Sequence, residues 1–184
     1  MTAMVGRLRA KAASFRRQPL FVQAWFLPTW ILLGISKALI FTLPFRRLAP
    51  WLGRRSAITP WVPLLTPDQE ARARLVGQAV RIAARHTPWD SNCLPQAIAA
   101  RALLGLYAVP YILCLGLTRN PGEPAGMMAH AWVAAGRVRV TGGLGFDQFT
   151  VVGCYLAPGQ ANLPPDEMHF CATDAVRADS GLSG

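Results

Sequence analysis

The sequence has no acidic residue before Asp68, and only 15% of its 184 residues are charged. Its first 60 residues contain ten Lys and Arg, whereas the remaining 124 contain nine cationic and nine acidic residues. The net charge of +10 therefore comes from the N-terminal region alone. Because 52% of the residues are hydrophobic, the composition excludes an intrinsically disordered chain.

The chain also lacks any known nucleic-acid-binding motif, so we do not expect nucleic acid as a partner. The basic N-terminal region is instead apolar and rich in tryptophan, with Trp25, Trp30, Trp51 and Trp61. A basic, aromatic and apolar surface is typical of contact with a membrane or with an acidic protein.

Cysteine is scarce, and no two cysteines form a CxxC pair. The four are Cys93, Cys114, Cys154 and Cys171. This pattern excludes a disulfide framework and disfavours a structural zinc site, and we expect neither a metal nor a cofactor. Cys114 lies in an apolar, strand-like run, which predicts a small core residue.

Residues 20–45 have a single charged residue, Lys37, and are long enough to cross a membrane. However, Lys37 would lie inside the span, and Pro28 and Pro44 interrupt the apolar stretch. No small-residue cleavage site follows, so a secretory signal is not predicted. We predict a cytoplasmic protein in which these residues form a helix that is buried or lies on a surface, and membrane contact through them stays open.

Composition predicts three parts of the chain. Residues 1–65 form a basic, apolar helical region that ends in a linker with a helical turn at 46–65. Residues 66–172 form the second domain, and residues 173–184 form a disordered tail. Within the second domain, start signals and periodicity predict two helices, followed by strands rich in Val, Ile, Tyr and Trp. The helices cover 66–86 and 93–106, and the strands cover 109–118, 127–135, 137–141 and 149–155. This order is typical of an α+β fold.

Cys93 stands at the start of the second helix. Ser91 or Asn92 can cap that helix, and Pro95 is tolerated only in its first turn. Backbone N–H groups at a helix start, here those of Asn92, Cys93 and Leu94, favour a thiolate and can also hold an oxyanion. Cys93 is therefore the candidate nucleophile.

His130 lies on the second predicted strand. Because strand residues alternate, it shares one face with Met128 and with Trp132, which we take as a supporting residue. A histidine on a sheet that packs against the cysteine's helix is able to reach the thiol and act as its base.

The stretch "SNCLPQAIAARALL", followed by "AHAWV" and "GRVRVTGG", resembles the lasso peptide leader peptidases. These are the stand-alone, transglutaminase-like cysteine proteases (the B component) of lasso-peptide biosynthesis. The resemblance covers residues 89–155. It implies a transglutaminase/papain-like core in which Cys93 is the nucleophile and His130 the general base and acid.

The third catalytic residue departs from the family pattern. Family members carry an acid near the end of the strand that follows the histidine, whereas residues 140–143 here read VTGG. The nearest acid is Asp147, which we take as the candidate orienter. A Thr hydroxyl or a backbone carbonyl could also orient the imidazole, because the orienter only fixes its tautomer and position.

The resemblance implies a cysteine endopeptidase that removes the leader of a ribosomally made lasso precursor before a separate ATP-dependent cyclase acts. The N-terminal region lacks the acid-containing strands of a leader-recognition domain, so we expect a separate small recognition protein. The basic region would dock that protein, the cyclase or the membrane. Two alternatives stay open: a transglutaminase-like acyltransferase, and a non-catalytic, membrane-associated scaffold.

Overall fold

The computed structural model describes residues 15–56, 63–119, 126–143 and 148–158. These residues form four helices and a five-stranded antiparallel sheet, which confirms the predicted α+β class. The predicted tail at 173–184 lies outside the described residues. The helices are α2 (Leu20–Thr42), α3 (Phe45–Leu52), α4 (Pro67–Ala84) and α5 (Cys93–Leu106), and the strands are β1 (Arg54–Ser56), β2 (Ile112–Arg119), β3 (Met127–Ala135), β4 (Val138–Thr141) and β5 (Thr150–Leu156).

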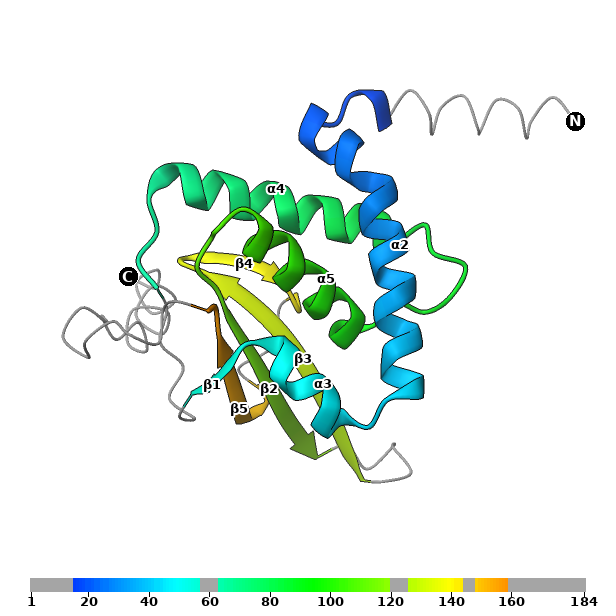
Figure 1. The fold of residues 1–184 in the computed structure, drawn as a ribbon, viewed down its shortest axis with the longest axis vertical. Helices are drawn as coiled ribbons and strands as arrows, with labels where there is room; N and C mark the ends of the chain where they lie inside the picture. Colours follow the sequence, from blue (N-terminus) through cyan, green and yellow to red (C-terminus); the bar gives the residue numbers. More distant parts are fainter. Residues whose placement is uncertain (1–14, 57–62, 120–125, 144–147, 159–184) are drawn as a thin grey trace, which may run out of the picture.

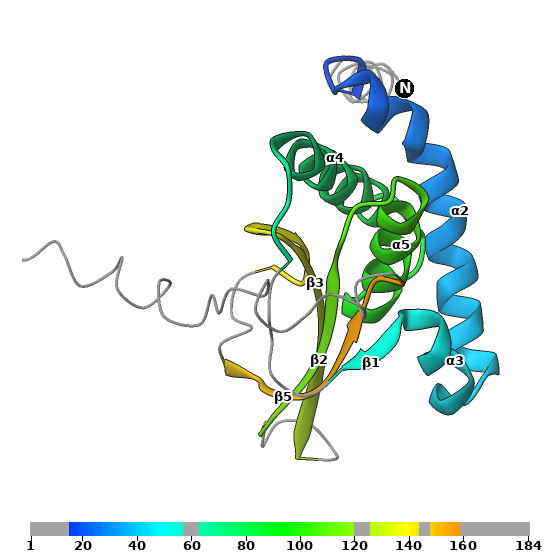
Figure 2. The same ribbon diagram turned by 60° about the vertical axis from the view of Figure 1, so that its left-hand side comes forward.

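The elements form three layers. The sheet has the order β1-β5-β2-β3-β4, α4 and α5 cover one of its faces, and α2 lies on the outer side of those two helices (Figures 1 and 2). The main core, which includes Val76, Leu104 and Val133, fills the space between helices and sheet. Because strand residues alternate, a smaller cluster that includes Cys114 and Trp132 lies on the opposite face of the sheet.

The starts of α4 and α5 follow the sequence signals. Thr66 and Gln69 form a capping box at α4, and Pro67 occupies the first turn, where its missing N–H costs nothing. Helix α5 begins at Cys93 and ends at Leu106, as predicted.

Two expectations for the N-terminal region are corrected. Residues 46–65 were expected to be a linker with a helical turn. Helix α3 covers the start of this range, but β1 was not expected there, and it pairs with β5 in the same sheet as the other strands. Pro28 was expected to interrupt the apolar segment, but α2 continues through it. The packing of α2 against α4 and α5 holds this helix together despite the lost hydrogen bond.

Helix α2 is long and apolar enough to cross a membrane. Its inner side nevertheless packs on the protein, where Val22, Thr29, Leu33 and Ser36 are buried. Lys37, the single charge of the segment, donates a hydrogen bond of 2.6 Å to the carbonyl of Asp90. The Lys37 ammonium group therefore links α2 to the turn before Cys93 by a hydrogen bond.

The buried Tyr111 gives a test of the fold at alkaline pH. Its hydroxyl donates to the Leu52 carbonyl and accepts from Nε of Arg101, at 3.3 and 3.2 Å. Burial raises the pKa of Tyr111 above its ordinary 10.0, although Arg101 opposes the shift. Because the folded-state pKa is the higher one, the stability linked to this proton is complete below the unfolded-state pKa and is lost as pH rises through the folded one.

We expect Tyr111→Phe to lose less stability than the wild type when urea unfolding at neutral pH is compared with unfolding above pH 10. The variant lacks an ionisable hydroxyl at position 111. The comparison is between the two changes in the free energy of unfolding with pH, so a lower stability of the variant at neutral pH does not affect it. Equal losses in the two proteins would contradict this assignment.

Candidate active site

Cys93 is the first residue of α5 and is partly exposed. Asn92 is the N-cap residue, but its side chain makes no capping hydrogen bond, so the expected side-chain cap is not formed. Ser91 does not cap the helix either, because its hydroxyl pairs with the Thr87 hydroxyl at 3.0 Å. No side chain in the described part of the chain therefore accepts from the first-turn amides.

Only two residues in the first turn before Gln96 offer such amides. These are Cys93 and Leu94, since Pro95 has no N–H and the Gln96 N–H already points to the carbonyl of Asn92. Two adjacent N–H donors beside a thiol are the arrangement that stabilises a thiolate and then an oxyanion.

The turn before Cys93 is held from two sides. The Gln96 side chain donates to the Ser91 carbonyl at 2.6 Å, which folds the helix start back on the turn. From α2, Trp30 packs against Trp89 with a ring separation of 5.0 Å, and Lys37 bonds the Asp90 carbonyl. The position of the thiol therefore depends on α2 as well as on α5.

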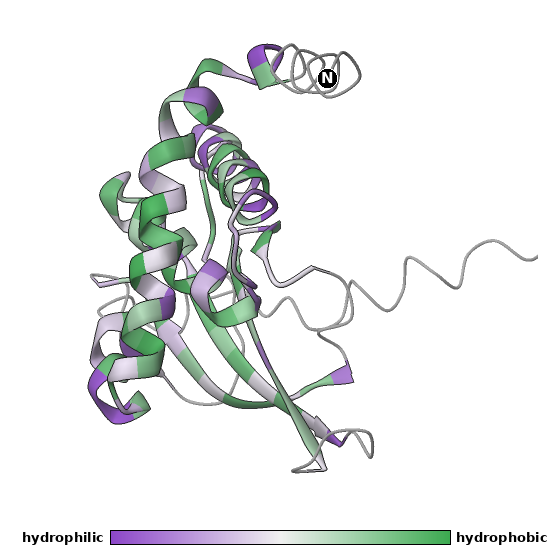
Figure 3. Ribbon diagram, turned by 90° about the vertical axis from the view of Figure 1, so that its right-hand side faces the viewer, coloured by the Kyte–Doolittle hydropathy of each residue, from purple (hydrophilic) through white to green (hydrophobic). Residues whose placement is uncertain are grey.

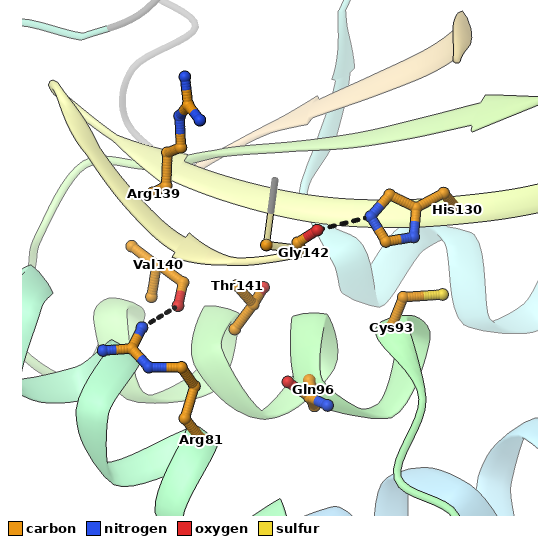
Figure 4. A pocket seen from close by; sticks show the side chains of 9 residues that line it. Arg81, Cys93, Gln96, His130, Arg139, Val140, Thr141 and Gly142 are labelled. Atoms are coloured by element: carbon orange, nitrogen blue, oxygen red, sulfur yellow. Dashed lines mark hydrogen bonds between the residues drawn. The ribbon is translucent and has the colours of Figure 1, made fainter. Parts of the chain in front are cut away.

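His130 lies on β3, just beyond the point where β4 ends. Its Nε2 lies 2.8 Å from the Gly142 carbonyl oxygen. A carbonyl only accepts, so Nε2 carries the proton, and Nδ1 of the neutral ring is then a proton acceptor. In Figure 4, Nδ1 lies on the side of the ring that faces Cys93.

The imidazole is fixed by aromatic neighbours as well. Its ring stacks on Phe149 at 4.8 Å and on Trp132 at 5.9 Å between ring centroids. Gly116, which pairs with His130 across the sheet, leaves room for these rings, because a Cβ there would meet Phe149 and Trp132 at 2.8 to 3.0 Å. Sequence reasoning missed Phe149 and Gly116, since no local pattern links them to His130.

Among the described residues, the Gly142 carbonyl is therefore the group that orients His130. Gly142 has φ +97°, and a Cβ at this position would meet the Cβ of Trp132 at 2.2 Å. Only glycine brings the backbone this close to β3. Of the alternatives, the Thr141 hydroxyl is buried without a hydrogen-bond partner in the described part of the chain, and Asp147 lies outside the described residues.

Cys93 and His130 line one pocket of about 470 Å³. The remaining lining residues are Arg81, Gln96, Arg139, Val140, Thr141, Gly142 and Gly143. Arg81 donates to the Val140 carbonyl at 3.5 Å and so joins α4 to β4 at the rim (Figure 4). The pocket thus combines the Cys93 thiol, the oriented imidazole of His130 and the start of α5 at Cys93, whereas Asn92 and Leu94 do not line it.

The other described cysteines do not resemble nucleophiles. Cys114 and Cys154 are buried on adjacent strands with their sulfur atoms 3.2 Å apart, and Cys114 is the core residue that the sequence predicted. The hydrogen bond to Cys154 and burial both raise the pKa of Cys114. Cys171 lies outside the described residues. Within the described ranges, Cys93 is thus the one cysteine that is not buried.

Outside the pocket, the structure describes one more histidine, His86. His86 does not line this pocket. Its Nδ1 bonds the Ile82 carbonyl at 2.8 Å, and its ring packs against Phe26. No group of three His, Cys, Asp or Glu that could hold a metal ion occurs among the described residues.

Comparison with known proteins assigns the chain to a family. The profile of the transglutaminase-like superfamily matches residues 39–154, which is more than half of the chain and includes Cys93, His130 and Gly142. The chain belongs to the transglutaminase-like superfamily. Its members are typically enzymes that use a Cys-His pair. No curated protein and no solved structure matches the chain.

Proposed function

We propose that this transglutaminase-like protein is a cysteine endopeptidase that removes the leader from a lasso-peptide precursor in the cytoplasm. The observation that carries the proposal is the pocket in which Cys93, at an uncapped helix start, meets an imidazole oriented by the Gly142 carbonyl. The resemblance of the segments around Cys93 and His130 to lasso leader peptidases supplies the substrate class.

The geometry supports the first half of a peptidase cycle. Nδ1 of His130 takes the Cys93 proton, and the thiolate attacks the carbonyl carbon of the scissile peptide bond. The negative oxygen of the tetrahedral intermediate accepts hydrogen bonds from the N–H groups of Cys93 and Leu94. When the C–N bond breaks, His130 returns its proton to the leaving nitrogen, and the core peptide departs with a free N-terminal amine.

The second half restores the enzyme. The leader remains as a thioester on Cys93, and His130 then takes a proton from water, which attacks the thioester carbonyl. Collapse of this intermediate returns the proton to sulfur and releases the leader as a carboxylic acid. The freed amine of the core is then the substrate for a separate ATP-dependent cyclase, and a separate small protein delivers the leader.

The decisive experiment is cleavage of a synthetic precursor by the purified full-length protein together with the recognition protein, followed by mass spectrometry. We expect a leader that ends in a free carboxylate and a core with a free amine. We expect no product from Cys93→Ala, because Cys93 supplies the one thiol among the residues that line the pocket. Circular dichroism would verify that this variant is folded.

Each other result points to a different function. A leader joined to an added amine identifies an acyltransferase, since amine has then replaced water as the acceptor. Normal processing by folded Cys93→Ala excludes the enzyme and leaves the scaffold.

A further inference from the structure

The outer side of α2 is an uncovered apolar surface, which we call the α2 stripe. Its large side chains are 47% to 82% exposed and recur along the helix: Leu20, Leu27, Ile31, Ile35 and Phe41. On α3, Phe45 and Trp51 are also large and exposed. Figure 3 shows α2 as a mainly hydrophobic column with hydrophilic segments beyond both of its ends. Soluble proteins rarely leave an apolar surface of this extent without an occupant.

The inner side of α2 decides how a membrane could meet this surface. Trp25 Nε1 donates to the Tyr107 hydroxyl at 2.6 Å, and Trp30 Nε1 donates to the His86 carbonyl at 3.1 Å. Lys37 adds its hydrogen bond to Asp90. A helix that crossed a bilayer would lose these bonds and its packing on α4 and α5, whereas a helix lying in the plane of the surface keeps all of them.

The charges near the stripe favour a negative surface. Four exposed arginines flank α2: Arg16 and Arg17 precede it, and Arg46 and Arg47 follow it on α3. None of them forms an ion pair with a described residue, and no acidic residue precedes Asp68. Basic side chains near an anionic bilayer are attracted to its acidic headgroups, so these arginines favour binding to a negatively charged membrane.

We propose that the α2 stripe binds the surface of an anionic phospholipid bilayer. Helix α2 then lies in the plane of the membrane, with its outer side chains in the boundary between headgroups and acyl chains. Aliphatic side chains along the helix, aromatic ones near its C-terminal end and arginines beyond both ends match such an interface. The sheet lies on the far side of α4 and α5 from α2, so it faces away from the lipid (Figure 2). This inference does not depend on the proposed peptidase activity.

The test is co-sedimentation of the full-length protein with vesicles of phosphatidylcholine alone or mixed with phosphatidylglycerol. We expect binding to the mixed vesicles, a marked decrease at high salt and weak binding to neutral vesicles. The double variant Ile31→Glu/Ile35→Glu should bind at least about tenfold more weakly, because it places two charges in the apolar boundary. Leu64→Glu is the matched control, since Leu64 is 73% exposed but lies outside α2.

Four outcomes would overturn the proposal. They are equal binding to both kinds of vesicle, equal loss in Leu64→Glu, protein that resists a high-pH carbonate wash as a spanning helix would, and absence of vesicle binding. In the last case, an oligomer lost in the double variant would identify a second copy as the occupant, and loss of recognition-protein binding would identify that protein. Cleavage of a soluble precursor should be unchanged in the double variant, so failure here and failure of the peptidase proposal are separable.

Discussion

His130→Ala is expected to slow leader cleavage by a factor on the order of 10³, because the pocket then has no proton acceptor for the Cys93 thiol. The same variant should alkylate Cys93 more slowly at neutral pH, since the imidazole no longer favours the thiolate. The two measurements are kcat/KM on the precursor and the rate of iodoacetamide modification. Both test whether His130 accepts the proton of the Cys93 thiol.

The chain offers a matched control in His86. This ring bonds the Ile82 carbonyl and packs on Phe26, and it does not line the pocket. His86→Ala should therefore leave both rates within a factor of a few, although it removes the same side chain. If His86→Ala and His130→Ala slowed cleavage equally, the effect would be one of stability and the role of His130 as base would be wrong.

The alkylation readout depends on the burial of the other thiols. Cys114 and Cys154 are at most 1% exposed and hydrogen-bonded to each other, so they should react only after unfolding. Replacing Cys171 by Ser removes the cysteine that lies outside the described residues. A Cys93 that reacts no faster than a model thiol in this background would favour the scaffold over the enzyme.

The sequence predicted those parts of the fold that depend on local signals. The start signals at residue 66 and the first-turn Pro95 placed two helix starts correctly, because caps and proline act within a few residues. Strand β1 was missed, since a three-residue edge strand with two arginines has no periodicity to detect. Its pairing with β5 joins residues about a hundred positions apart, which no local pattern encodes.

In the candidate site, too, the sequence predicted the residues that carry local motifs and not the contacts between distant residues. Cys93 and His130 were recognisable because their segments carry motifs, and the structure brings both into one pocket. A backbone carbonyl remained one of three open alternatives, and its residue was not named, because the direction of the Gly142 carbonyl follows from a positive φ and from contact with Trp132. Likewise, the hydrogen bond from Lys37 to the Asp90 carbonyl joins residues 53 positions apart, and no sequence pattern predicted it.

Gly142→Ala is expected to lower kcat by about 10²-fold with little change in KM, because a displacement of about 1 Å in a catalytic group has an effect of this size. The added Cβ would meet the Cβ of Trp132 at 2.2 Å, so the backbone must move and its carbonyl must leave Nε2 of His130. Gly142 is thus a positioning residue, and its loss should affect proton transfer more than substrate binding. Steady-state kinetics on the precursor would measure both constants.

Gly126→Ala separates this effect from simple backbone strain. Gly126 also has a positive φ, +64°, but a Cβ there would meet nothing within 4 Å, and the residue does not line the pocket. Both variants should lose stability through the strained φ, yet only Gly142→Ala should lose kcat. Asp147→Asn completes the comparison, because the sequence named that acid as the orienter. If Asp147→Asn removed kcat while Gly142→Ala stayed within about twofold of wild type, the acid would hold His130 and the carbonyl would not.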